Sequence, residues 1–181
     1  MNIKHHPTDQ TLMDYASGTM SQAMELLVAT HMTVCPHCRD KVAEFETMGG
    51  AVLENVARME MADHSLDHVM AMLERETANE NPAVQELPMT RRIAVGESKG
   101  TVRLMKIAPG VSIPDHGHHG HEMTLLLKGS YIDDIGRFRA GDVADLDDDV
   151  DHQPIADTAE ECICLIATDA PMKFSGFLPK L

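Results

Sequence analysis

The chain has 181 residues, a formal net charge of −14, and few aromatic residues (no Trp, two Tyr and four Phe). A surface this acidic is repelled by phosphate backbones, so we do not expect direct binding of nucleic acid. The opening residues contain no apolar segment typical of a signal peptide, and no apolar run reaches the roughly 18 residues that span a bilayer. We therefore expect a cytoplasmic protein that does not associate with membranes.

Helical periodicity dominates the first half of the chain. Capping residues and prolines predict helix starts at Pro7-Thr8-Asp9, Ser21, Pro36 and Asp63 or Ser65. In the third of these helices the residues expected to face inward are Val42, Phe45, Met48 and Val52. A polar stretch, residues 77–82, ends in proline and is typical of a linker.

Residues 31–38 place His31, Cys35 and Cys38 at positions i, i+4 and i+7. His31 lies on the apolar stripe of the second helix, and a helix that opens at Pro36 brings both thiols to the same point. Thiolates and imidazole favour tetrahedral Zn²⁺, which needs a fourth ligand. The nearest candidates for that ligand are His6, His5 and His37. The alternatives are a metal-free redox dithiol and ordinary buried cysteines.

The spacing His31-x-x-x-Cys35-x-x-Cys38, behind a histidine near the N-terminus, resembles the zinc anti-sigma domain of proteins that inhibit extracytoplasmic-function sigma factors. With the opening Ile3-Lys4-His5-His6, the run Val28-Ala29-Thr30-His31 and the four expected helices, it resembles the ChrR family. The resemblance implies that Zn²⁺ is held by His6, His31, Cys35 and Cys38. It also implies that the helices insert between the two conserved domains of a sigma factor and mask its RNA polymerase surface.

From about Leu87 the chain changes to short β-like runs separated by Gly, Pro and Asp. Regular short strands with turn signals predict an all-β sandwich or barrel. The expected strands are residues 101–107, 123–127, 131–135, 142–146 and 162–168. We expect an α+β protein, with a helical unit of about four helices in residues 1–80, a linker in 81–88 and an all-β unit in 89–181.

A metal-binding pattern lies within this all-β unit. Gly110 is followed after five residues by His116, then by His118, Glu122 and Gly129, which matches the first cupin motif in spacing and residue type. Residues i and i+2 of a strand point to the same face, so His116 and His118 are expected to project together into a cupin barrel, and Glu122 shares their parity.

The fourth ligand of this second cluster must come from a distant strand, and His152 is the candidate. The second cupin motif is degenerate, because an acidic run from Asp145 to Asp151 replaces the Pro-x-Gly segment expected before the histidine. Three imidazoles and one carboxylate can hold Zn²⁺, Fe²⁺, Mn²⁺ or Ni²⁺, and Zn²⁺ is our expectation. The alternatives are an empty barrel and a surface tract of histidines that scavenges metal.

Cys162 and Cys164 lie at i and i+2 of an expected strand and so face the same way. Inert packing is the ordinary role of buried cysteine, and a redox role beside the metal is the alternative. The segment Cys162-Ile-Cys164-Leu and the terminal Phe174-Ser-Gly-Phe-Leu-Pro-Lys-Leu also resemble the ChrR family. The resemblance therefore covers nearly the whole chain.

These features lead to two hypotheses for the function. In the first, the protein is an anti-sigma factor and not an enzyme: the helical unit inhibits a sigma factor, and the cupin unit, as the family implies, senses singlet oxygen or organic peroxide and triggers release. In the second, it is a metal-dependent cupin enzyme of the dioxygenase type with a zinc-bound helical extension. The helical His–Cys motif favours the first, because a catalytic cupin has no need of it.

Overall fold

We describe the fold from a computed structural model, which defines residues 2–75, 90–93, 95, 100–117, 120–170 and 173–174. The helices are α1 (Asp9–Ser17), α2 (Gln22–Met32), α3 (Pro36–Glu54) and α4 (Ser65–Arg75). None of the helices in these ranges is long and apolar enough to cross a membrane. The predicted linker, 81–88, lies outside the described residues, as do the residues after Phe174.

The helix boundaries follow local capping signals. The side-chain oxygen of Thr8 accepts a hydrogen bond from the Thr11 N–H at 3.2 Å and caps α1, which ends at Gly18 with a left-handed φ of 68°. Ser21 caps α2 in the same way. Pro36 occupies the first turn of α3, where a missing N–H costs no helical hydrogen bond. The predicted helix starts are therefore confirmed.

The β-strands begin after the helices. They are β1 (Thr90–Ile93), β2 (Thr101–Ile107), β3 (His116–Gly117), β4 (Glu122–Lys128), β5 (Ser130–Asp133), β6 (Gly136–Arg139), β7 (Val143–Leu146), β8 (Ile155–Ala156), β9 (Cys162–Thr168) and β10 (Lys173–Phe174). Antiparallel pairing gives a five-stranded sheet in the order β1-β2-β9-β4-β7, a three-stranded sheet β6-β5-β8 and the pair β10-β3. The predicted strands 101–107 and 162–168 coincide with β2 and β9.

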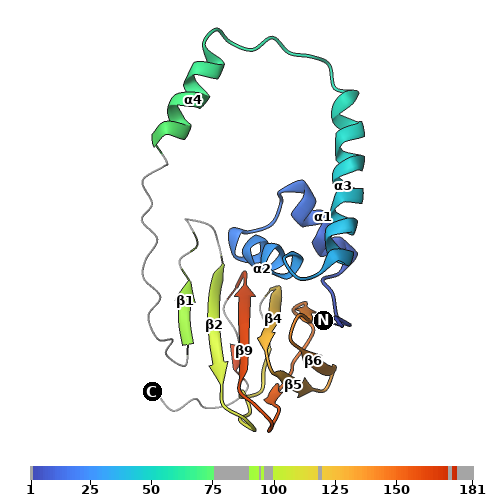
Figure 1. The fold of residues 1–181 in the computed structure, drawn as a ribbon, viewed down its shortest axis with the longest axis vertical. Coiled ribbons are helices and arrows are strands. Elements are labelled where there is room, and N and C mark those ends of the chain that lie inside the picture. The colour runs from blue at the N-terminus through green and yellow to red at the C-terminus, as the bar shows by residue number, and fades with distance from the viewer. Residues whose placement is uncertain are drawn as a thin grey trace.

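Strand β9 lies in the middle of the five-stranded sheet (Figure 1), and all of its residues except Ile163 are buried. Cys162, Cys164 and Ile166 belong to an apolar cluster with Tyr131, in the interior of the barrel. Leu165 and Ala167, which alternate with them along β9, belong to the cluster that the helices share. Strand periodicity thus divides one strand between two cores, one inside the barrel and one beneath the helices.

Helix α2 packs against β9, β4 and β2 and joins the helical unit to the sheet (Figure 1). Leu27 and Val28 of α2 are fully buried in the same cluster as Val102 and Leu125 of the sheet. Because this core is shared, the first three helices and the sheet support each other's burial of apolar surface. The barrel therefore acts as a platform for the helices.

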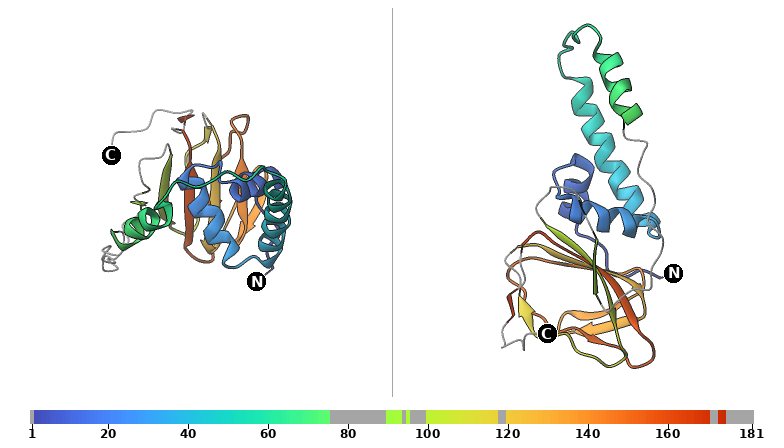
Figure 2. Two further views of the ribbon diagram at one scale, coloured as in Figure 1. Left: turned by 90° about the horizontal axis from the view of Figure 1, so that it is seen from above. Right: turned by 90° about the vertical axis from the view of Figure 1, so that its left-hand side faces the viewer.

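The C-terminal half of α3 and helix α4 extend away from the barrel (Figure 2). Val42 is buried, but Met48 and Val52 are 56% and 67% exposed, so the prediction that these two residues face inward is wrong. The apolar periodicity correctly marks one face of the helix. Its second half extends beyond the sheet, so among the described residues that face has little to pack against. The helix itself continues through Gly49 and Gly50.

Candidate metal centres

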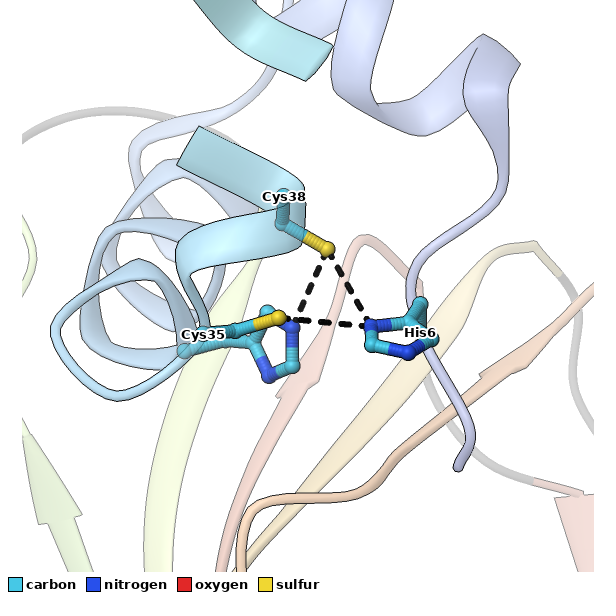
Figure 3. A group of neighbouring side chains, drawn as sticks. His6, Cys35 and Cys38 are labelled. Atoms are coloured by element: carbon cyan, nitrogen blue, oxygen red, sulfur yellow. Dashed lines mark hydrogen bonds between the residues drawn. The ribbon is translucent and has the colours of Figure 1, made fainter. Parts of the chain in front are cut away.

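The N-terminal cluster consists of His6, His31, Cys35 and Cys38 (Figure 3 labels three of them). His6 lies in the extended segment before α1, His31 in the last turn of α2, Cys35 at the N-cap of α3 and Cys38 in its first turn. One ligand atom from each residue lies within 4.8 Å of all the others. Three separate chain segments therefore meet at one point.

The distances within the N-terminal cluster fit a tetrahedral ion. His6 Nδ1 lies 3.4 Å from both sulfurs, and His31 Nε2 lies 3.3 Å from Cys38 Sγ. The nitrogen and sulfur ligands of tetrahedral Zn²⁺ are separated by about 3.5 Å when the bonds have their usual lengths. The donor set of two sulfurs and two imidazoles is one that structural zinc sites use.

The tautomer of His31 suits metal binding. Its Nδ1–H donates to the backbone carbonyl oxygen of Gly141 at 3.0 Å, which leaves Nε2 without a proton and directed at Cys38. Burial is the largest influence on this ring and lowers the pKa of His31 to about 4, so the imidazole is neutral near pH 7. Gly141 belongs to the barrel, so the barrel orients a candidate ligand of the helical unit.

The influences that act on the Cys38 thiol disfavour its ionised form. Burial, followed by the hydrogen bond with Cys35, raises the pKa of Cys38 to about 12. A buried thiolate pair is costly without a cation, and metal binding requires thiolates. The N-terminal cluster therefore fits a cation, and its chemistry fits a soft divalent one such as Zn²⁺.

His5 and His37, the other candidates for the fourth ligand, are not part of the cluster. The ring of His5 packs on Phe138 at a centroid distance of 4.4 Å, and its Nδ1 lies 3.3 Å from Asp142. The ring of His37 lies beside that of His6, with centroids 4.9 Å apart. Of the three candidates, His6 is the one whose ligand atom reaches the thiols.

The barrel cluster consists of His116, Glu122 and His152, all buried, with ligand atoms within 4.8 Å of one another. Glu122 Oε1 lies 4.0 Å from His116 Nε2 and 3.6 Å from His152 Nε2. A backbone bridge between His116 and His152 holds the two histidines side by side despite the acidic run before His152. His118, the further predicted ligand, lies outside the described residues.

Hydrogen bonds orient both imidazoles of the barrel cluster. His116 donates from Nδ1 to the carbonyl oxygen of Pro114 at 2.8 Å, and His152 Nδ1 lies 3.3 Å from a carboxylate oxygen of Asp133. Burial lowers the pKa of His152, but Asp133 and Glu122 outweigh burial and raise it to about 9. These hydrogen bonds direct each Nε2 at the cluster, which suits a divalent cation held by nitrogen and oxygen. Such a cation would replace the proton that the raised pKa leaves on His152 near pH 7.

Cys162 and Cys164 both face the interior of the barrel, as the predicted strand parity requires. Cys164 lines a small cavity beside Glu122 and His152. Its volume of about 20 Å³ is roughly enough for one water molecule. The hydrogen bond with Cys162, and then burial, raise the pKa of Cys164 well above its ordinary value. This thiol is therefore protonated at neutral pH, which favours inert packing over nucleophilic chemistry.

The sequence did not single out Gly141 or Asp133 as residues that orient the candidate ligands. Gly141 acts through its backbone carbonyl, which leaves no signal in side-chain chemistry, and Asp133 lies 19 residues before His152. Neither contact follows from helical or strand spacing, because the first depends on how the helical unit packs on the barrel and the second on how the barrel closes around His152. Proximity in the fold is the only indication of their role.

The fold and its two clusters define the class of protein: a cupin barrel that carries a helical unit with a His–Cys cluster. A family model described as "ChrR Cupin-like domain" matches residues 76–171. The chain is 36% identical to the anti-sigma-E factor ChrR of Cereibacter sphaeroides, over 100% of this chain and 97% of that protein. The chain therefore belongs to the ChrR family.

The structure is also similar to a solved one, the crystal structure of Rhodobacter sphaeroides SigE in complex with the anti-sigma ChrR. The TM-score is 0.77 and the sequence identity 36%, over 93% of this chain and 100% of that one. This match covers the helices as well as the barrel, and it confirms the predicted fold class, a small helical unit followed by a cupin barrel.

Proposed function

We propose that this chain is an anti-sigma factor that binds and inhibits an extracytoplasmic-function (group IV) sigma factor and so regulates transcription. The observation that carries the proposal is the 36% identity to the anti-sigma-E factor ChrR over essentially the full length of both chains. Since a sigma factor acts on RNA polymerase, the protein works in the cytoplasm. Inhibition requires a surface that competes for the sigma factor, and we assign this surface to the helical unit.

The helical unit presents apolar surface that the rest of the described chain does not cover. On α3, Met48, Val52 and Leu53 are 56%, 67% and 72% exposed, and together with Met13 and Phe45 they line a groove. Uncovered apolar surface of this kind marks a site of protein association, and methionine adapts well to a partner's surface. We propose that a sigma factor covers this groove.

Helix α4 adds a second apolar surface. Leu66, Val69 and Met70 follow helical spacing on one face and are 50% to 70% exposed. An amphipathic helix in this state resembles one that lies in the apolar groove of a partner. Together, α3 and α4 give the helical unit two surfaces with which to engage a two-domain partner.

We assign Zn²⁺ to the N-terminal cluster of His6, His31, Cys35 and Cys38. Bound there, Zn²⁺ would join the N-terminal segment to α2 and α3, and a unit this small gains much of its stability from such a link. The assignment rests on the donor set, the inter-ligand distances and the neutral His31 imidazole described above. The expected role is structural, since the four protein ligands leave no open coordination position.

We assign a second divalent cation to the barrel cluster, with His118 as a further ligand beside His116, Glu122 and His152. Zn²⁺ is the expected ion, and Fe²⁺, Mn²⁺ and Ni²⁺ are the alternatives. The barrel would sense oxidative stress, as singlet oxygen or organic peroxide, and promote release of the sigma factor. The alternative function, a dioxygenase-like enzyme, is not favoured, because the relative that matches essentially the whole chain is an anti-sigma factor.

Titration calorimetry of the full chain with the group IV sigma factor of its native host tests the proposal. The wild type should bind, and Val52→Asp, which places a charge in the groove on α3, should weaken binding at least about 30-fold, equivalent to about 2 kcal/mol. Val111→Asp is the matched control, because Val111 is 48% exposed on the barrel, and it should bind like the wild type. Equal affinities of the two variants would overturn the assignment of the groove.

A further inference from the structure

The segment that carries His6 is held by the barrel. The Val143 N–H of β7 donates to the carbonyl oxygen of His5 at 3.0 Å. The N–H groups of Lys4 and His5 donate to one carboxylate oxygen of Asp142 at 2.7 and 3.1 Å. The residues just before His6 are therefore fixed to β7 and to the turn before it.

Asp145 of β7 holds the residues just after His6. Its Oδ2 accepts hydrogen bonds from the Thr8 N–H and the Thr11 hydroxyl, both at 2.8 Å. Thr8 is the N-cap of α1, so the same carboxylate also fixes the start of that helix. The side chain of Asp145 is 5% exposed, so bulk water competes poorly for these bonds.

The other oxygen of Asp145 is paired with the barrel cluster's own segment. Oδ1 accepts a hydrogen bond from Nε2 of His121, which directly precedes Glu122. The hydrogen bond to Asp145 raises the pKa of His121. His121 directly precedes β4, in which Met123 is the register partner of Asp145. A single buried carboxylate thus contacts both the residue adjacent to Glu122 and the residue two positions after His6.

We propose that Asp145 couples the barrel cluster to the N-terminal cluster. A change in the coordination or position of Glu122 displaces His121, which directly precedes it. This displacement weakens the hydrogen bond between Asp145 and the Thr8 N–H. The segment that carries His6 then becomes less firmly attached to the barrel. The proposal rests on the proposed function, since it names the route by which the barrel would regulate the helical unit. It requires two arrangements of the Asp145 carboxylate: one hydrogen-bonded to both His121 and Thr8, and one that no longer accepts the hydrogen bond from Thr8.

The test is hydrogen exchange of the Thr8 amide, followed by NMR on the full-length, metal-loaded protein without any sigma factor. Glu122→Gln perturbs the barrel cluster and should speed exchange at Thr8 about tenfold. His121→Phe removes the link but leaves Asp145 on Thr8. In the His121→Phe background, therefore, Glu122→Gln should change the exchange rate less than about twofold.

Two further variants locate the effect. Asp145→Ala removes the acceptor itself and should give the fastest exchange at Thr8, whereas Asp148→Ala removes an exposed acid three residues away and should have no effect. The proposal is overturned if Glu122→Gln leaves Thr8 unchanged in the wild-type background, or if it has the same effect with and without His121. Because no sigma factor is present, that failure is distinct from a failure to bind the sigma factor.

Discussion

Leu27 connects the helical unit to the barrel, and its substitution by alanine measures how strongly the two units depend on each other. The side chain is fully buried between α2 and the sheet. Leu27→Ala removes three carbon groups worth about 0.8 kcal/mol each, or about 2.4 kcal/mol of transfer free energy. The cavity left behind adds to this loss, so we expect a decrease of about 3–4 kcal/mol in the free energy of unfolding.

Urea unfolding followed by circular dichroism, at fixed metal concentration, measures this loss. For a chain of this size the same loss lowers Tm by roughly 6–16 °C. Leu26→Ala is the matched control, because Leu26 is the neighbouring residue and is 37% exposed, and it should cost about 1 kcal/mol or less. The shared-core reasoning is refuted if both variants lose the same free energy, or if Leu27→Ala destabilises the helices while the barrel unfolds as in the wild type.

Two further predictions concern the barrel. Gly129→Ala should lower the free energy of unfolding by about 2 kcal/mol or more, because φ is +72° and the new Cβ would lie 2.5 Å from a backbone carbonyl oxygen. The control is Gly49→Ala on α3, where the new Cβ meets open space, and it should instead stabilise the protein by about 0.5–1 kcal/mol. Thermal unfolding compares the two variants. Hydrogen bonds from the Thr158 N–H and then Arg137 lower the pKa of Asp157, so its contribution to stability is present above the unfolded pKa and is lost as the pH falls through the folded pKa. The difference in stability between wild type and Asp157→Asn should therefore be present at pH 6 and disappear well below about pH 4, and a difference that persists there contradicts the assignment.

Much of the N-terminal cluster could be predicted from the sequence because its chemistry is local. The i, i+4, i+7 spacing of His31, Cys35 and Cys38, together with the proline that opens α3, determines how the three side chains converge. Strand parity likewise places Cys162 and Cys164 together inside the barrel. Glu122 reaches the cluster from β4, a different strand from that of His116, so its shared parity with His116 did not determine its position. In both cases one turn or one strand supplies the geometry, so periodicity is sufficient.

Contacts between the units could not be predicted in this way. The bonds from Asp142 and Asp145 to the N-terminal segment join residues 134 to 138 positions apart in the chain. Helical periodicity also gave the wrong environment for Met48 and Val52, since it identifies an apolar face but not what covers it. An apolar face that binds a partner has the same periodicity in the sequence as an apolar face that packs into the core.

The most direct test of the central claim is run-off transcription with RNA polymerase and the group IV sigma factor of the native host. The full chain, loaded with metal, should abolish transcription from the promoter of that sigma factor at about one equivalent per sigma factor, and Val52→Asp should require a large excess. Full transcription in the presence of a several-fold excess of folded, metal-loaded wild-type protein would contradict the proposed function.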